Sequence, residues 1–78
     1  MKRKDVTERV KLLFKGYMLQ NGDISFKELA RQTGIDYHTL RDHLKHPELF
    51  RVIEIREIHK ILNFNQSDLV FLITLNEN

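Results

Sequence analysis

Side chains able to bind an anion or the edge of a base are concentrated in residues 25–46. This stretch contains four basic residues, three acidic residues and three of the four histidines. Arginine can donate two hydrogen bonds at once to a phosphate or a guanine edge, and lysine meets phosphate as a point charge. These residues therefore offer hydrogen bonding and charge to a ligand.

No catalytic pattern accompanies these side chains. The glycines stand apart at Gly16, Gly22 and Gly34, so they form no glycine-rich phosphate loop. Ser25 and Ser67 fall where helices are expected to begin, and no base lies near either of them in a pattern that would activate a nucleophile. We therefore expect no enzymatic activity.

The histidines do not predict a metal site. His43 and His46 are three residues apart on one expected helix, but His59 falls in another helix and the chain has no cysteine. We expect no metal and no cofactor. Protonation of His38 or His46 would instead add attraction for phosphate as the pH falls.

Two short helices joined by a tight turn must position the polar residues of 25–46. Ser25 and Glu28 have the spacing of a capping box at the start of the first helix, and Gly34 suits its end. Ala30 lies where the two helices would cross. A helical pair of this kind lays its first helix across a duplex and its second in the major groove.

Asp36 is expected to cap the second helix, residues 36–46, and Leu40 and Leu44 give it an inward stripe. Similar patterns predict further helices at about Val6–Gln20, at Val52–Leu62 and after a cap at Asn65. The fold class is therefore all-α: a compact bundle of four to five helices in a single domain, residues 1–78.

The segments outside these helices are expected to be irregular. Residues 1–5 would form a basic N-terminal arm, and residues 47–51 a loop after Pro47. The alternating, β-branched pattern of residues 51–55 leaves a short strand as an alternative, which would make a winged variant of the fold.

Positive charge is concentrated in the first half of the chain. Residues 1–20 carry a charge of +4 and residues 47–78 carry −2, within a net charge of +2. The longest apolar run, residues 69–73, is far too short to span a bilayer, and no signal peptide is visible. We expect a cytoplasmic protein with no membrane partner and no small-molecule substrate.

Five residues match, in order and spacing, the pattern of the phage repressor/Cro-type helix-turn-helix proteins: Ala30, Gly34, Ile35, Leu40 and Leu44. Downstream, Ile58, Leu62 and residues 63–69 resemble the fourth helix, loop and fifth helix of that family. The resemblance covers about two-thirds of the chain. It implies a lambda-repressor-like DNA-binding domain with its helix-turn-helix at residues 25–45.

The resemblance carries DNA contacts over to the start and outer face of the second helix of this pair. Arg41 is the best candidate to read a base, while Lys27 and Lys45 would meet phosphates. Each assignment has a plainer alternative, in which the residue is a solvated, capping or packing side chain. The candidate DNA-binding residues are Lys27, Tyr37, His38, Thr39, Arg41, Asp42 and Lys45.

The implied function is sequence-specific binding to a double-stranded DNA operator by a transcriptional regulator, most simply a repressor from a phage or mobile element. The alternative is a protein-interaction or antitoxin-like helical module that does not read DNA. A homodimer is expected through the apolar C-terminal residues Phe71, Leu72, Ile73 and Leu75, unless these cover the first helix within a monomer.

Overall fold

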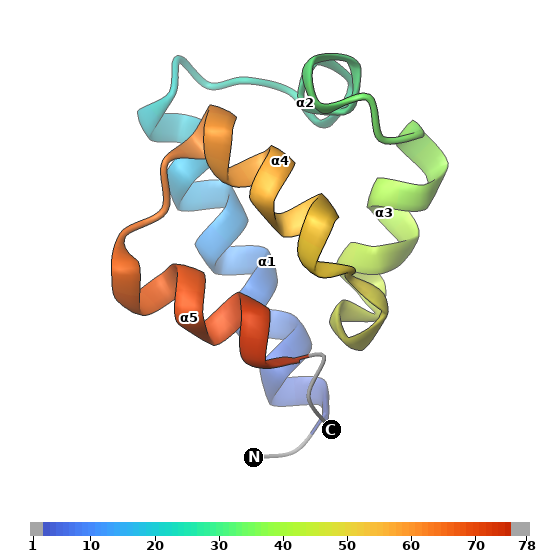
Figure 1. Ribbon diagram of the computed structural model, residues 1–78, viewed down its shortest axis with the longest axis vertical. Helices are drawn as coiled ribbons and strands as arrows, with labels where there is room; N and C mark the ends of the chain where they lie inside the picture. Colours follow the sequence, from blue (N-terminus) through green and yellow to red (C-terminus); the bar gives the residue numbers. More distant parts are fainter. Residues whose placement is uncertain (1–2, 76–78) are drawn as a thin grey trace.

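The computed structural model describes residues 3–75, which form helices and no strand. Five α-helices and one short 3-10 helix wrap around a single core (Figure 1). Their bounds are Arg3–Gln20 (α1), Phe26–Thr33 (α2), Tyr37–Lys45 (α3), Pro47–Leu49 (η1), Val52–Leu62 (α4) and Gln66–Thr74 (α5). The predicted fold class, a compact all-α bundle, is confirmed.

Helices α2 and α3 begin at the predicted capping residues. The Ser25 hydroxyl accepts the Glu28 N–H at 3.1 Å, and the Asp36 carboxylate accepts the Thr39 N–H at 3.1 Å. Only half of the predicted capping box forms at α2, because the Glu28 carboxylate bonds forward to Arg31 instead of back to Ser25. Each cap satisfies one backbone donor that the first turn would otherwise leave open.

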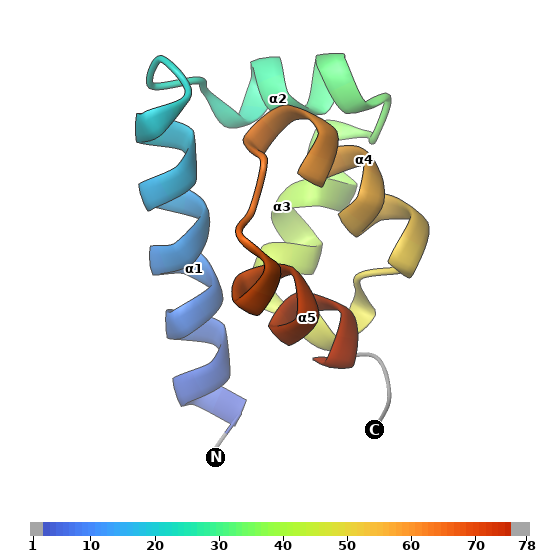
Figure 2. The ribbon, with the colours of Figure 1, turned by 60° about the vertical axis from the view of Figure 1, so that its left-hand side comes forward.

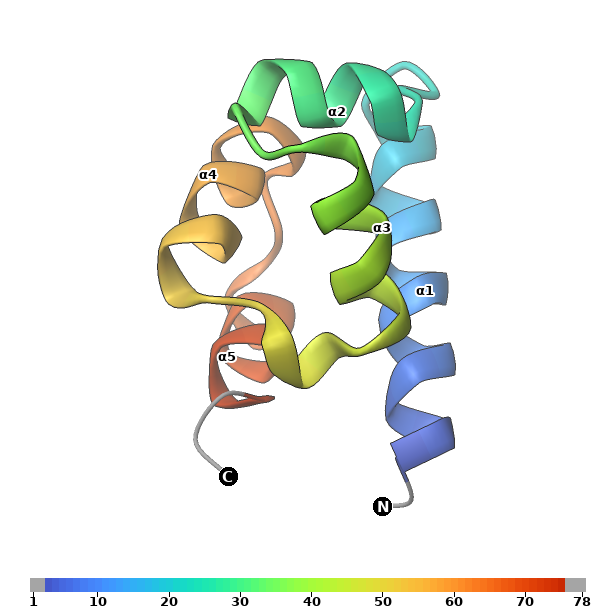
Figure 3. The same ribbon diagram turned by 90° about the vertical axis from the view of Figure 1, so that its right-hand side faces the viewer.

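Gly34 ends α2 as the sequence predicts. Its φ of +76° lies in the left-handed region, and its N–H donates to the Ala30 carbonyl at 2.9 Å. Glycine adopts this conformation without the clash that a Cβ would cause. The turn directs the chain into α3, which lies below α2 in Figure 3.

The core draws side chains from every α-helix and from the two segments that flank α4. Phe14 lies near its centre, with its ring 5.8 Å from that of Phe50 and 5.7 Å from that of Phe64. Contacts between such rings add to the free energy gained by burial alone. The buried apolar residues are Val10, Phe14, Met18, Leu29, Ala30, Leu40, Leu44, Phe50, Ile55, Ile58, Leu62, Phe64 and Leu72.

One tyrosine joins the two helices that lie furthest apart in the sequence, α1 and α5, and Figure 2 shows α5 lying across the lower half of α1. The Tyr17 hydroxyl accepts the Asn65 N–H at 3.0 Å and donates to the Asp68 carboxylate at 2.6 Å. The Asn65 side chain accepts the Asp68 N–H at 2.8 Å, so the predicted cap of α5 is confirmed. Tyr17 takes the place of the direct return bond from Asp68 to Asn65.

The N-terminal arm predicted at residues 1–5 is wrong for the part that the structure describes. Helix α1 begins at Arg3, so Lys4 and Asp5 belong to its first turn. A carboxylate such as that of Asp5 is favourable beside the positive end of a helix. Residues 1 and 2 of the predicted arm lie outside the described residues.

The loop predicted at residues 47–51 is also partly helical. Pro47 opens the 3-10 helix η1, where its fixed φ suits the first position, and the buried Phe50 anchors the segment in the core. The alternative of a strand over residues 51–55 is wrong. The Glu54 carboxylate accepts the Arg51 N–H at 2.8 Å, and α4 starts at Val52. Its helical burial pattern overrides the β-branched composition of that stretch.

Part of the C-terminal apolar surface serves the monomer. Leu72 is fully buried, and the Arg9 guanidinium lies 3.9 Å from the centre of the Phe71 ring. Phe71, Ile73 and Leu75 are half-buried against the core, whereas Val70 remains 51% exposed. Among the described residues, no helix combines the length and apolar character that crossing a membrane requires.

Candidate nucleic-acid interface

The predicted contact residues lie on the side of the molecule formed by α3 and the beginning of α2. In Figure 3, α3 faces the viewer, α2 crosses above it and α1 runs beside it. His38, Arg41, Asp42 and Lys45 are exposed on α3, and Lys27 is exposed in the first turn of α2. Helical spacing puts these α3 residues on one outward surface.

Tyr37 and Thr39 are only half-buried, and the two serve different purposes. Both the Thr39 N–H and its hydroxyl bond to Asp36, at 3.1 and 3.4 Å, so Thr39 belongs to the cap of α3. The Tyr37 ring contacts the His38 ring edge-on, with 5.4 Å between centroids. Tyr37, unlike Thr39, therefore lies against another predicted contact residue, His38.

Two aromatic rings surround the Arg41 side chain. The guanidinium carbon of Arg41 lies 4.9 Å from the centre of the Phe26 ring and 6.0 Å from that of Tyr37. The Lys27 ammonium lies 5.9 Å from the same Tyr37 ring. Sequence reasoning missed Phe26, because its place beside Arg41 depends on how α2 meets α3.

Lysines from α1 extend this surface, and sequence reasoning missed them as well. A hollow of about 220 Å³ between α1 and α3 is lined by Lys11, Lys15, Phe26, Arg41, Leu44 and Lys45. A neighbouring hollow of about 420 Å³ is lined by Lys4, Thr7, Glu8, Lys45 and His46. Positions 4, 11 and 15 share one flank of a helix, so their spacing carried a signal for this surface.

We call the surface made by these cations the basic face: Lys4, Lys11, Lys15, Lys27, Arg41 and Lys45. Within the described part of the chain, five of the six form no ion pair, and Lys11 lies 4.0 Å from Glu8. Acidic residues on or beside this face include Asp42, Glu8 and Asp23. The face therefore keeps most of its positive charge available to an outside anion.

Arg31, which lies one helical turn beyond Lys27 on α2, is neutralised. Its Nε donates to both Glu28 carboxylate oxygens, at 3.0 and 2.9 Å, and one terminal nitrogen adds a further bond to Glu28. The Arg31 hydrogen bonds, with a smaller contribution from Gln32, lower the pKa of Glu28 to about 2. The Glu28 carboxylate is therefore charged throughout the physiological pH range.

His43 turns away from the basic face and toward α4. Its Nδ1 lies 3.1 Å from the Glu54 carboxylate, and its ring meets Phe50 edge-on at 5.4 Å. Both polar side chains are largely buried, with 13% and 10% of their surfaces exposed. This pair joins α3 to α4. Among the described residues, no group of three histidine or acidic side chains is arranged to hold a metal ion.

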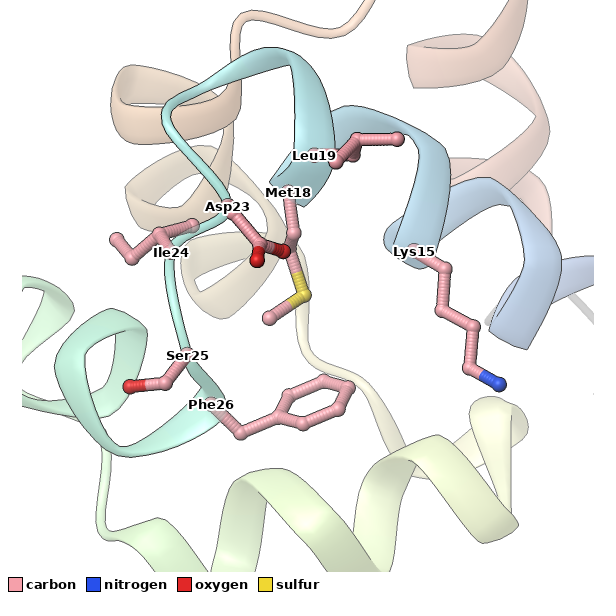
Figure 4. Close-up of a pocket in the computed structure, with 7 residues that line it drawn as sticks. All are labelled: Lys15, Met18, Leu19, Asp23, Ile24, Ser25 and Phe26. Atoms are coloured by element: carbon pink, nitrogen blue, oxygen red, sulfur yellow. The ribbon is translucent and has the colours of Figure 1, made fainter.

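A third hollow, of about 510 Å³, opens between the end of α1 and the start of α2 (Figure 4). The Met18 and Phe26 side chains lie at its centre, and Lys15 extends away at its edge. Asp23 and Ser25 contribute its polar groups. Phe26 thus borders both this hollow and the one beside Arg41.

Comparison of the chain with protein-family models, with curated proteins and with solved structures finds no match. The features that point to a function are the geometry and charge of the basic face and the sequence pattern of α2 and α3.

Proposed function

We propose that this chain binds double-stranded DNA in a sequence-specific manner and regulates transcription, most simply as a repressor. The observation that carries the proposal is the basic face, where cations from three helices surround the exposed side of α3 and, among the described residues, five of the six form no ion pair. Duplex DNA is a regular polyanion, and neutralising its phosphates supplies most of the affinity of such proteins.

The dimensions of α3 support the proposal. A helix with its side chains is about 10–12 Å wide, which suits the major groove of B-DNA at about 12 Å. Helix α3 is nine residues long and offers Tyr37, His38, Arg41 and Asp42 at the positions where the phage repressor/Cro-type resemblance expects base contacts. Lys45 and the lysines of α1 would then meet the flanking phosphates.

The placement of negative charge is also favourable. Three acidic residues of the second half are occupied within the protein: Glu54 by His43, Glu57 by Lys60 at 3.0 Å, and Asp68 by Tyr17. All three belong to α4 or α5, and none of them to α3. Duplex DNA lying on α3 would therefore meet few carboxylates.

Salt dependence of binding tests the proposal directly. Six cations that each neutralise one phosphate predict a slope of about −5 in a plot of log affinity against log salt concentration. Selection from random duplexes, followed by footprinting, would identify the preferred site. A folded protein that binds no duplex at low salt would contradict the proposal and favour a protein-interaction module.

A matched pair of charge reversals separates the basic face from general positive charge. Lys15→Glu with Lys45→Glu should abolish binding, because both residues line the hollow beside Arg41. Arg56→Glu with Lys60→Glu makes the same change in net charge on α4 and should bind nearly as the parent does. Equal losses in the two variants would mean that the surface is not the one proposed.

A homodimer on an inverted repeat belongs to the same proposal. Two copies bound one helical turn apart, about 34 Å, would double the sequence that is read. Helix α5 offers Val70, which is 51% exposed, beside the half-buried Phe71. Sedimentation of the parent and of Val70→Glu, each with and without the selected site, would show whether α5 pairs two copies.

A further inference from the structure

We infer that Phe26 is a positioning residue for Arg41 and so determines base specificity, an inference that rests on the proposed function. Phe26 lies at the first position of α2, fifteen residues before Arg41 in the chain, and the distance from the Arg41 guanidinium carbon to its ring centre is 4.9 Å. Tyr37 approaches the same guanidinium from α3 at 6.0 Å.

This contact holds the guanidinium without using its donors. A cation over an aromatic ring is attracted by the negative face of the ring and needs no hydrogen bond. In the part of the chain that the structure describes, Arg41 forms no ion pair, so its N–H groups stay available. Arg31, whose Nε and one terminal nitrogen donate to Glu28, shows the opposite arrangement.

Restraint of the guanidinium matters because arginine has many rotamers. A free arginine side chain loses that freedom when it forms a paired contact with a guanine, and the loss weakens the contact. A side chain already held against a ring has less freedom to lose. The benefit falls on the contact that Arg41 makes with its base, whereas phosphate contacts by the lysines are unaffected.

Phe26 is itself fixed in place. Its ring is half-buried against the core and borders the two hollows on either side of it. The Ser25 cap and the first turn of α2 hold its backbone. The turn at Gly34 sets the angle between α2 and α3. It therefore also sets where the Phe26 ring lies relative to the Arg41 side chain.

Two substitutions at Phe26 form the test. Phe26→Leu keeps an apolar side chain but removes the ring, and Phe26→Tyr keeps the ring. Discrimination between the selected site and the same site altered at the base pair that Arg41 reads should fall about two- to fivefold in Phe26→Leu. It should be retained in Phe26→Tyr. Binding to unrelated duplexes and the salt slope should not change in either variant.

A double-mutant cycle excludes a merely structural effect. In an Arg41→Ala background, Phe26→Leu should cause no further loss of discrimination, because the group that Phe26 positions is gone. A Phe26→Leu variant that weakens binding to all duplexes alike, or that loses as much without Arg41, would overturn the inference and leave DNA binding itself standing.

A measurement without DNA keeps the two proposals distinguishable. Aromatic ring currents should move the Arg41 δ-methylene proton resonances upfield in the free parent and in Phe26→Tyr, and by clearly less in Phe26→Leu, where only the more distant Tyr37 ring remains. Unshifted resonances in the parent would overturn the inference whatever the protein binds. Shifted resonances in a protein that selects no duplex would instead show that the proposed function has failed, and the specificity role with it.

Discussion

Arg31 on α2 and Arg41 on α3 are both exposed, but their surroundings are opposite. The Glu28 carboxylate receives several hydrogen bonds from Arg31, so the charge of this arginine is neutralised and donors on its Nε and one terminal nitrogen are occupied. Arg41 is held by the rings of Phe26 and Tyr37, which neither neutralise its charge nor use its hydrogen-bond donors. Composition treats the two arginines alike, whereas the structure gives only the second a free fork of donors.

The same contrast extends to larger regions. On α4, Lys60 and Glu57 neutralise each other, and Glu54 is buried against His43. On the basic face, cations are instead surrounded by apolar and aromatic neighbours such as Leu44 and Phe26. The positive charges of such a surface repel one another. A polyanion that binds there relieves this repulsion and pairs with cations that have no acidic partner within the protein. The candidate site is therefore defined by which side chains surround the cations, more than by how many cations there are.

The largest expected effect on stability comes from the turn that brings Phe26 near Arg41. Gly34→Val forces a β-branched residue to a φ of +76°, which should cost about 1–3 kcal/mol and lower the melting temperature by about 5–20 °C. Thermal unfolding followed by circular dichroism measures this change in melting temperature.

Gly16 provides the control, because it is helical and a Cβ there meets nothing within 4 Å. Gly16→Ala should therefore stabilise by about 0.5–1 kcal/mol. Equal melting temperatures for the parent and Gly34→Val would show that the turn does not need its left-handed residue.

Substitution of the two arginines tests the comparison itself. Arg41→Ala should cost about 1–3 kcal/mol of binding free energy on the selected site and relax the preference at one base pair. Arg31→Ala should change affinity by less than about twofold, since its donors already serve Glu28. Titration of labelled duplex with each variant gives both numbers. A larger loss from Arg31→Ala would reverse the assignment.

Single lysines on α1 should give a smaller and less specific effect. Lys15→Ala should weaken binding to every duplex alike and make the salt slope shallower by about 0.9, as expected for the loss of one phosphate contact. Lys60→Ala is the control, because Lys60 is paired with Glu57 on α4. Loss of preference at a base pair in Lys15→Ala would mean that α1 reaches base edges.

The smallest effect is a change in titration. The pKa of Glu28 is lowered to about 2 from 4.5, chiefly by Arg31. A lowered carboxyl pKa means that the stabilisation from this pair is complete above about pH 4.5 and is lost as the pH falls toward 2. Carbon-detected NMR titration of the Glu28 carboxyl group should find this midpoint. In Arg31→Ala the midpoint should return toward 4.5, and an unmoved midpoint would contradict the pairing.

Local signals in the sequence were enough to predict the five α-helices, although α1 begins earlier than expected and the 3-10 helix η1 was missed. Ser25, Asp36 and Asn65 each cap the helix expected of them, and Gly34 has the left-handed φ that its position required. Capping depends on residues three or four positions apart, so a single sequence reveals it. The helix predicted at Val52–Leu62 is confirmed, and the alternative of a strand over residues 51–55 fails because β-branched composition is a weak preference that burial of α4 overrides.

Contacts between helices could not be predicted from these local signals. Phe26 beside Arg41 and His43 beside Glu54 each join two helices, and neither has a spacing rule within one element. The α1 lysines were an exception. Their spacing in the sequence places them on one flank of the helix, although it does not show that α3 lies beside that flank. Candidate residues on one helix were therefore predictable, whereas the groups that position or neutralise them required the packed structure.

The Tyr17 hydroxyl, which bonds to Asn65 and Asp68, gives the molecule a convenient optical property. The chain has two tyrosines and no tryptophan, so its near-ultraviolet signal comes mainly from Tyr17 and Tyr37. Tyr17 reports whether α5 is docked on α1, and Tyr37 reports the surroundings of α3. Tyr17→Phe and Tyr37→Phe would each leave one chromophore. An unlabelled protein could then be followed separately at its C-terminal helix and at its basic face.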